Sequence, residues 1–524
     1  MGQPLSSVED MGLSYWVIHL LVFALTVKFA WSQVQGYRTR NLMPPHPPGI
    51  PFFGNLFQIP QFQWRLFTEW KEKYGPLFSL NFAGQPVVVV NSGEVAADLF
   101  DRRSNIYSDR PPFIMAGEIL TGGIFIAFSR YGDLWRRLRR AAHEGFNVRA
   151  VQTYQPLQEK ESVRLVHHLL TEPENWDTHL KRSTASTVLC AVYGWESIGK
   201  DGDAIVEYIN NSTYRLVRAC LPGAYLVEIF PSMMYLPEWL AKWKREGYAA
   251  HREDSVMFQS LMDDVEKKKD AGELPPCFAG TLIEEEQKYD LTKKEAAWLA
   301  GSMFGAGAET TAAALAVFML AMTLYPEVMK KAQREIDSVV GRGRMPTFAD
   351  HDNLPYIVAL VKEVVRWRPV APLGLPRRST RDDWYNGYFI PAGTLILANS
   401  WAINRDPKDF PDYDEFRPER YLDASGQLVD VLPNTHGQGH VSYGFGRRVC
   451  VGMNLANQAL FIDIASILWA ATIEQAIDEN GNFVIPSKDD CIDKGVVVRP
   501  VPFECVIKPR GQEVEGIVLE NLAA

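Results

Sequence analysis

A glycine-rich turn around one cysteine restricts what this chain can form more than any other feature of the sequence. In the stretch SYGFGRRVCVGMNLA (442–456), three glycines flank Cys450, and a helix-forming run begins at Met453. Glycine lets backbone amides approach closely, and N–H groups aimed at one sulfur stabilise a thiolate, as does the positive end of a following helix. We therefore expect a lowered pKa for the Cys450 thiol. Arg448, two residues earlier, is placed to pair with an anionic group of a bound ligand.

Two other interpretations of this turn stay open at this point. A structural cysteine buried in a glycine-rich loop is the more common arrangement. A zinc site would recruit His436 and His440, although the loop has no second cysteine and no obvious fourth ligand.

The second strong feature is an apolar stretch near the start of the chain, MGLSYWVIHLLVFALTVKFAW (11–31), with Lys28 as its one firm charge. As a helix it is long enough to cross the hydrocarbon core of a bilayer, about 30 Å thick. Arg38 and Arg40 follow it, so the positive-inside tendency predicts that the rest of the protein faces the cytoplasm. A cleaved secretory signal is the alternative, but no basic residue precedes the stretch and it is long for a signal core. We interpret residues 1–31 as a segment with a single membrane-anchor helix.

After a proline-rich linker (32–50), the patterns predict one large body (51–510) that is mainly α with a small β-sheet region, followed by a flexible tail (511–524). The net charge of −9 argues against a nucleic-acid partner, and six cysteines without Cys-x-x-Cys spacing fit a reducing compartment. Residues 264–289 are polar and predict a surface loop or a frayed helix. A hairpin is expected over 78–92, with its turn at Ala83-Gly84, and further strands near 384–397 and 496–507. Helices are expected over 94–102, 132–144, 156–170, 293–325, 326–340 and 355–367.

An unusual segment, Gly-Ala-Gly-Ala-Glu-Thr-Thr (305–311), lies inside the long apolar helix expected over 293–325. Each mid-helix glycine costs about 1 kcal/mol relative to alanine, so a compensating need is expected. Small residues would admit a flat macrocycle, and a threonine hydroxyl can bond back into the helix and open it. Close packing against another helix would explain the glycines alone, but not an acid followed by two threonines.

Two further pairs lie at helical spacing. Glu363 and Arg366 are placed at i and i+3 among apolar residues, which predicts a buried ion pair. Trp135 and Arg139, at i and i+4, share a face from which both can hold one carboxylate.

Together these residues closely resemble the cytochrome P450 family, whose cysteine loop runs Phe-x-x-Gly-x-Arg-x-Cys-x-Gly. Here the loop is Tyr443, Gly446, Arg448, Cys450 and Gly452, with tyrosine in place of phenylalanine, so its hydroxyl must find a partner. The resemblance implies the cytochrome P450 fold, haem b as cofactor and Cys450 as the axial ligand of its iron.

The same resemblance implies a role for each of the other motifs. Glu363 and Arg366 would join Arg420, from FRPERY (416–421), in a structural cluster. Thr310 would hydrogen-bond the oxygen at the iron, and Glu309 would relay protons to it. The residues expected to hold the haem propionates are Arg448, Trp135, Arg139, Arg110 and Arg377. The substrate pocket is expected to include Phe113, Phe125, Phe304, Ala306, Val370, Ala371, Leu373 and Val496.

The implied function is a haem-thiolate monooxygenase that oxidises a lipophilic small molecule, a terpenoid, sterol or aromatic secondary metabolite like those of the fungal enzymes that the chain resembles. Because no flavin or dinucleotide motif appears, electrons are expected from NADPH through NADPH–cytochrome P450 reductase, with cytochrome b5 as a further donor. The implied location is the endoplasmic reticulum membrane. Two alternatives are a haem-thiolate isomerase or dehydratase acting on peroxides, which typically lacks the acid–threonine pair present here, and a non-catalytic membrane haem binder.

Overall fold

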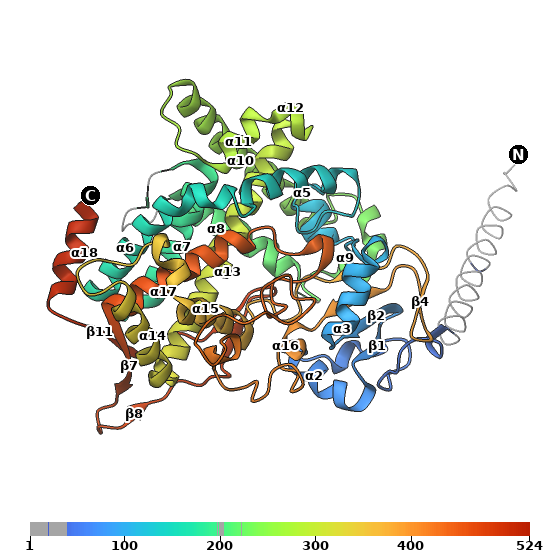
Figure 1. Cartoon of the computed structure of the whole chain (residues 1–524). Coiled ribbons are helices and arrows are strands. Elements are labelled where there is room, and N and C mark those ends of the chain that lie inside the picture. Colours follow the sequence, from blue (N-terminus) through green and yellow to red (C-terminus); the bar gives the residue numbers. More distant parts are fainter. Residues whose placement is uncertain (1–18, 20–38, 196, 199–203, 222, 524) are drawn as a thin grey trace, which may run out of the picture.

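Helix α13 (Lys293–Leu324) passes through the middle of the molecule, with other helices packed around it (Figure 1). The computed structural model describes residues 19, 39–195, 197–198, 204–221 and 223–523. Thr292 and Glu295 form a capping box at the start of α13, and the helix ends just before Pro326. Because its second half is buried on all sides, α13 is a core helix and not an amphipathic surface helix.

Within the described residues, α13 is also the one helix long and apolar enough to cross a membrane, but 78% of its apolar window is buried inside the protein. Apart from His19, the anchor predicted over 11–31 lies outside the described residues.

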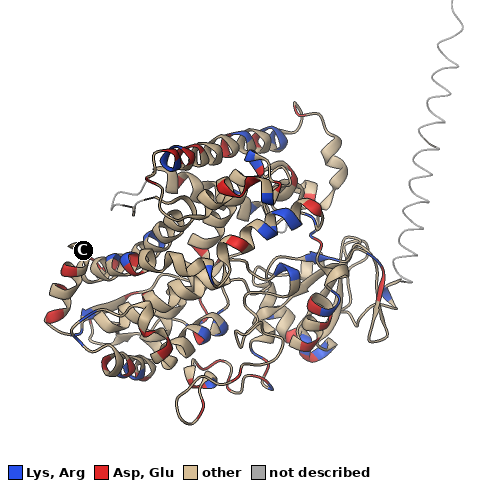
Figure 2. Cartoon of the chain, turned by 45° about the horizontal axis from the view of Figure 1, so that its top comes forward, with Lys and Arg blue, Asp and Glu red and all other residues tan. Residues whose placement is uncertain are grey.

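Most of the remaining helices lie around α13, whereas α2 and α3 lie beside the strands β1 and β2, at the side away from α18 (Figure 1). The helices are α2 (Gln63–Tyr74), α3 (Gly93–Ala97), α4 (Ser104–Tyr107), α5 (Asp133–Phe146), α6 (Gln155–Thr171), α7 (Trp176–Tyr193), α8 (Ala204–Ala219), α9 (Leu226–Ile229), α10 (Lys242–Asp270), α11 (Phe278–Glu284), α12 (Glu286–Tyr289), α14 (Pro326–Val339), α15 (Pro355–Trp367), α16 (Ser400–Ile403), α17 (Met453–Ala470) and α18 (Glu513–Ala523). Over these helices basic and acidic residues are intermixed (Figure 2).

The largest sheet has the strand order β1-β2-β6-β3. Strand β2 pairs antiparallel with β1 and parallel with β6, and Val87–Val90 of β2 are completely buried. The predicted hairpin and its turn at Ala83-Gly84 are therefore confirmed. The strands are β1 (Leu77–Phe82), β2 (Gln85–Val90), β3 (Arg377–Arg378), β4 (Asp383–Tyr385), β5 (Tyr388–Ile390), β6 (Leu395–Ala398), β7 (Ala471–Ile477), β8 (Phe483–Val484), β9 (Cys491–Asp493), β10 (Val498–Pro500) and β11 (Cys505–Pro509).

The end of the proline-rich linker packs on this sheet. The carbonyl oxygens of Pro44 and Pro45 accept hydrogen bonds from the hydroxyl and the N–H of Ser79, at 2.7 and 2.8 Å. The Phe389 N–H donates to the Leu42 carbonyl at 2.8 Å. Residues 42–45 are thus part of the folded body.

Two segments differ from expectation. We expected a surface loop or a frayed helix over 264–289, but helix α10 continues to Asp270, and α11 and α12 follow it. In α10, Phe258, Leu261 and Val265 form one buried face. The many charged residues around them hide this apolar pattern in the sequence. Beyond Arg510, where a flexible tail was expected, α18 places Val514 and Val518 in the main core.

Candidate functional site

A large cavity lies between α13, α7, α17 and the turn that carries Cys450. Its volume is about 350 Å³. This lies within the roughly 300–1,000 Å³ of an ordinary ligand pocket, so the cavity can hold a bound small molecule.

Cys450 lies deep in the protein and presents its accessible surface to this cavity. Its own N–H donates to the Tyr443 carbonyl at 2.9 Å, which closes the turn, and its sulfur accepts hydrogen bonds from the N–H groups of Gly452 and Met453. Burial nevertheless raises the pKa of the thiol, against the lowering effect of these donors and of Arg139. The expected lowered pKa is therefore wrong for the protein alone, because the loop does not offset desolvation. A bound metal ion would supply the missing positive charge.

The turn itself requires glycine at position 446. Gly446 has φ +53°, and a Cβ there would collide with the carbonyl oxygen of Phe100. The hydroxyl of Tyr443 finds the partner that burial demands, since it donates to Oδ1 of Asn457 at 2.6 Å.

Three arginines line the same cavity: Arg110 and Arg377, which are buried, and Arg448, which is partly buried. Burial lowers the pKa of Arg110 to about 10, of Arg377 to about 9 and of Arg448 to about 8, and Arg110 further lowers the last two by repulsion. Two carboxylates partly oppose these shifts: Asp109 acts on Arg110 and Arg448, and Asp101 acts on Arg377. Arg130 already binds Asp109 through Nε at 3.0 Å and Nη2 at 2.5 Å.

The hydrogen bonds of these guanidinium groups leave one donor free. Arg110 and Arg448 donate to backbone carbonyl oxygens, and Arg377 Nη2 donates to the Phe445 carbonyl at 2.6 Å. Arg377 Nη1 is buried without a partner among the described residues. A cavity with clustered buried cations and an unused donor fits a ligand with anionic groups, such as the two carboxylates of haem.

Trp135 and Arg139 lie near this cluster without belonging to the cavity wall. The Arg448 guanidinium lies 4.2 Å from the centre of the Trp135 ring, so Trp135 supports Arg448. Burial lowers the pKa of Arg139, which Cys450 partly opposes, so Arg139 is close to the sulfur.

On α13, Thr310 faces the cavity and its hydroxyl donates to the Ala306 carbonyl at 2.7 Å, as the sequence predicted. Glu309 is not part of the wall; its Oε1 forms an ion pair with Lys494 Nζ at 3.0 Å. Lys181 of α7 also lies within electrostatic range of both groups.

The predicted structural cluster is present. Arg366 donates to both oxygens of Glu363 at 2.7 and 2.8 Å, with neither side chain exposed. Arg420 Nε lies 3.3 Å from Glu363 Oε1. The cluster joins α15 to the segment that precedes the cysteine turn.

The expected substrate pocket is partly correct. Five of the eight residues line the cavity: Ala306, Val370, Ala371, Leu373 and Val496. The other three do not: Phe304 is completely buried in the core, and Phe113 and Phe125 pack on Phe128, with ring centres 5.2 and 5.1 Å apart. Four further residues line the cavity that no sequence motif marks, because α7 and the inner face of α17 carry none: Thr184, Thr187, Val188 and Asp463.

The zinc interpretation finds no support in the described part of the chain, which holds no group of three potential metal ligands. His436 pairs with Asp101 at 3.4 Å, and His440 accepts a hydrogen bond from the Ser442 N–H at 3.3 Å.

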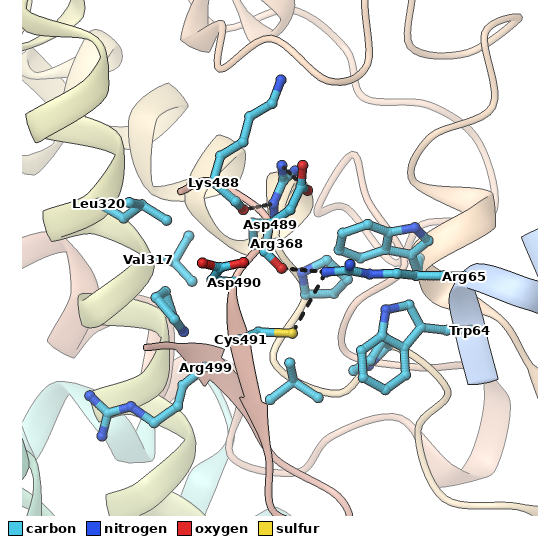
Figure 3. A pocket seen from close by; sticks show the side chains of 15 residues that line it. Trp64, Arg65, Val317, Leu320, Arg368, Lys488, Asp489, Asp490, Cys491 and Arg499 are labelled. Carbon is cyan, nitrogen blue, oxygen red and sulfur yellow. Dashed lines mark hydrogen bonds and ion pairs between the residues drawn. The ribbon is translucent and has the colours of Figure 1, made fainter. Parts of the chain in front are cut away.

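A second, much smaller hollow of about 20 Å³ lies between α2, α13 and the strands β9 and β10 (Figure 3). Arg65 points across it, and its Nη2 lies 2.5 Å from the Asp489 carbonyl oxygen and 3.7 Å from the Cys491 sulfur. The groups that line it bind one another, so this hollow is structural.

A turn-held cysteine facing a cavity with buried arginines and a small-residue helix segment defines a haem-thiolate protein. A sequence model of the cytochrome P450 family matches residues 44–482. Cytochrome P450 monooxygenase 58 of Postia placenta is 58% identical over 94% of each chain, and a cytochrome P450 monooxygenase of Armillaria gallica is 49% identical over 97% of each. Cytochrome P450 monooxygenase iboC of Amanita muscaria is 40% identical over 96% of each. The chain belongs to the cytochrome P450 family and is a haem-dependent monooxygenase.

Proposed function

We propose that this protein is a membrane-anchored monooxygenase that holds haem b on Cys450 and oxidises a lipophilic secondary metabolite. The observation that supports this most directly is that Cys450 and three arginines line one cavity. Arg110, Arg377 and Arg448 would hold the propionates, with Arg139 nearby and Trp135 supporting Arg448. When bound, the haem supplies the iron at which dioxygen is reduced and split.

Thr310 and Glu309 have different roles in proton delivery. The Thr310 hydroxyl donates its hydrogen to the Ala306 carbonyl, so its lone pairs face the cavity as acceptors. Glu309 must exchange its contact with Lys494 for water before it can carry a proton inward. Glu309 therefore acts as a residue that moves between an ion pair and the cavity, while Thr310 positions the proton acceptor.

The substrate side of the cavity is apolar. Val370, Ala371, Leu373 and Val496 line it, and they offer no side-chain hydrogen bond. This favours a terpenoid, a sterol or an aromatic compound. Electrons would come from NADPH through NADPH–cytochrome P450 reductase, and cytochrome b5 is an additional donor.

The proposed location is the endoplasmic reticulum membrane, with residues 1–31 as anchor and the body in the cytoplasm. Asn210 and Asn211 begin glycosylation acceptor sequences in α8. A cytoplasmic body leaves them unmodified, so glycosidase treatment should not change the mass of the protein from its native membrane. Sugar at either asparagine would overturn this topology.

The test of haem ligation is the carbon monoxide difference spectrum of the reduced protein. We expect Cys450→Ala to abolish the absorption band of thiolate-bound haem, while the control Cys491→Ala, in the second hollow, keeps it. An unchanged spectrum for Cys450→Ala would contradict the ligand assignment.

The test of the reaction is oxygen consumption with NADPH and reductase. Lipophilic metabolites are first screened for the spectral shift that follows displacement of water from the iron. A compound that produces the shift should then be oxidised with dependence on dioxygen and NADPH. Turnover of a peroxide without NADPH would favour an isomerase or dehydratase instead.

A further inference from the structure

The inner end of the main cavity, between α7, α13 and α17, contains buried polar side chains that the protein does not satisfy. Thr187, Thr311 and Asp463 line the cavity and are 5%, 6% and 4% exposed. Within the described part of the chain, none of the three makes a side-chain hydrogen bond, whereas Thr184 beside them donates to the Leu180 carbonyl at 3.0 Å. The unsatisfied groups come from three different helices and face one space.

Asp463 is the decisive member of this group. It lies on α17 among core residues, with Ile462 and Ile464 on either side almost completely buried. Burial raises its pKa well above the usual range, and the carboxylate of Glu161 on α6 raises it further. A protonated carboxyl group has one donor and retains acceptor capacity, so it requires a polar partner in the cavity.

Glu161 lies within electrostatic range of Asp463 and forms an ion pair with a partly exposed arginine. Its Oε1 binds Arg164 Nη1 at 2.6 Å, whereas its Oε2 is buried without a partner among the described residues. The Arg164 side chain is 27% exposed, so this ion pair reaches solvent at α6. Arg182 of α7 is the other cation within range of Glu161.

Water is the occupant that fits this end of the cavity. Buried water needs two to four polar partners, and Thr187, Thr311 and Asp463 supply them. An apolar occupant would leave each of these groups without a hydrogen-bond partner, which is unfavourable.

We propose that the inner end of the cavity holds ordered water, and that Asp463 passes protons through this water to α13 at Thr311 and Thr310. The inference rests on the proposed monooxygenase function, which consumes protons. For each proton, the O–H bond of Asp463 breaks and water accepts the hydrogen ion. The Asp463 carboxylate regains one from solvent on the side of the Glu161–Arg164 ion pair, where the Arg164 side chain is 27% exposed. No electrons move, and one proton passes from solvent to the cavity.

The first test is spectroscopic and independent of turnover. Photolysis of carbon monoxide from the reduced haem-loaded protein perturbs groups that share the cavity. The infrared difference spectrum should contain a band from a protonated carboxyl group that shifts in D2O. We expect Asp463→Asn to remove this band and Glu309→Gln to retain it. A band that persists in Asp463→Asn would overturn the proposal.

The second test measures hydrogen peroxide released per NADPH consumed. Asp463→Asn keeps the size of the side chain but cannot supply a proton, so peroxide release should rise severalfold with the carbon monoxide spectrum unchanged. Thr187→Val replaces the hydroxyl with a methyl group of similar size and should also raise peroxide release. This variant tests the proposal if Asp463→Asn does not fold. The exposed Asp352→Asn is the control.

Unchanged peroxide release in both cavity variants would overturn this inference while leaving the haem-thiolate function intact. Loss of the thiolate spectrum in the unmodified protein would instead refute the proposed function itself.

Discussion

Arg377 is a buried cation whose Nη1 has no hydrogen-bond partner among the described residues, and the nearby carboxylate of Asp101 does not offset the cost of its burial. The Arg377→Met variant should therefore have opposite effects on the two forms of the protein. It should weaken haem retention by about 1.5–3 kcal/mol, the usual value of a hydrogen bond to a charged group. It should also stabilise the protein without haem, because it removes a desolvated charge that Arg110 repels. The ratio of haem to protein absorbance and denaturant unfolding of the haem-free protein measure the two effects.

The neighbouring Arg378→Met is the matched control, since Arg378 does not line the cavity. The pH dependence adds a second check. The folded-state pKa of Arg377, about 9, lies below its ordinary value, so the charge destabilises the haem-free fold at lower pH. This penalty should fade as the pH rises through about 9, and the difference between variant and parent should shrink with it. A constant difference would contradict the assignment.

At this scale, motif residues were predictable and neighbours without motifs were not. Cys450, Thr310 and the Glu363–Arg366 pair could be placed because their spacing carries their chemistry. Phe304 was wrongly placed in the pocket, since a shift of one position around α13 turns a side chain from the cavity into the core. Asp463 was missed because a lone acid in an apolar helix shows its importance only through its surroundings.

Among the elements, α13 offers a matched pair of glycine substitutions. At Gly301 a Cβ would lie 2.6 Å from the buried Phe258 ring, whereas at Gly305 it would meet the Thr213 hydroxyl, which can rotate away. We expect Gly301→Ala to destabilise the protein by about 1–3 kcal/mol through overpacking. Both variants gain roughly 1 kcal/mol in helix propensity, but only the Thr213 hydroxyl can move aside, so Gly305→Ala should cost less. Denaturant unfolding of both haem-loaded variants tests the order, and equal losses would refute it.

The packing of the helices explains which of their features could be predicted from the sequence. Close packing of α13 accounts for two of its glycines: Gly305 lies against Thr213 of α8, and a Cβ at Gly307 would lie 3.0 Å from Val188 of α7. Helices with clear apolar periodicity, such as α14 and α15, begin at the predicted prolines and end within a residue of the predicted limits. Helices α7, α8 and α10 were not predicted, because α7 is buried nearly all round and α10 is dominated by charges.

For the whole molecule, Asp414 is a cross-link between distant segments. It binds Arg405, Lys488 and, at 3.4 Å, Arg368. Although burial opposes the change, these cations lower the pKa of Asp414 to about 2. Asp414→Asn should therefore destabilise the protein at neutral pH, and the difference from the parent should vanish as the pH falls through about 2. Unfolding measured across acidic pH tests this, and a loss independent of pH would point to packing instead.

A second prediction at this scale concerns the start of the chain. Deletion of residues 1–38 should leave a folded body that no longer integrates into membranes. Deletion of residues 1–50 should also destabilise it, because Pro44 and Pro45 bind Ser79. Carbonate extraction and thermal unfolding separate the two effects. A shorter deletion that still behaves as an integral membrane protein would refute the anchor.

The parallel pairing of β2 with β6 joins Val87–Val90 to Leu395–Ala398. A ribosome therefore releases the β1–β2 hairpin long before its neighbour exists, and the nascent chain exposes an apolar strand edge throughout that interval. Production of this protein should thus respond to chaperones and to slower synthesis at low temperature, since both protect the waiting edge from other chains.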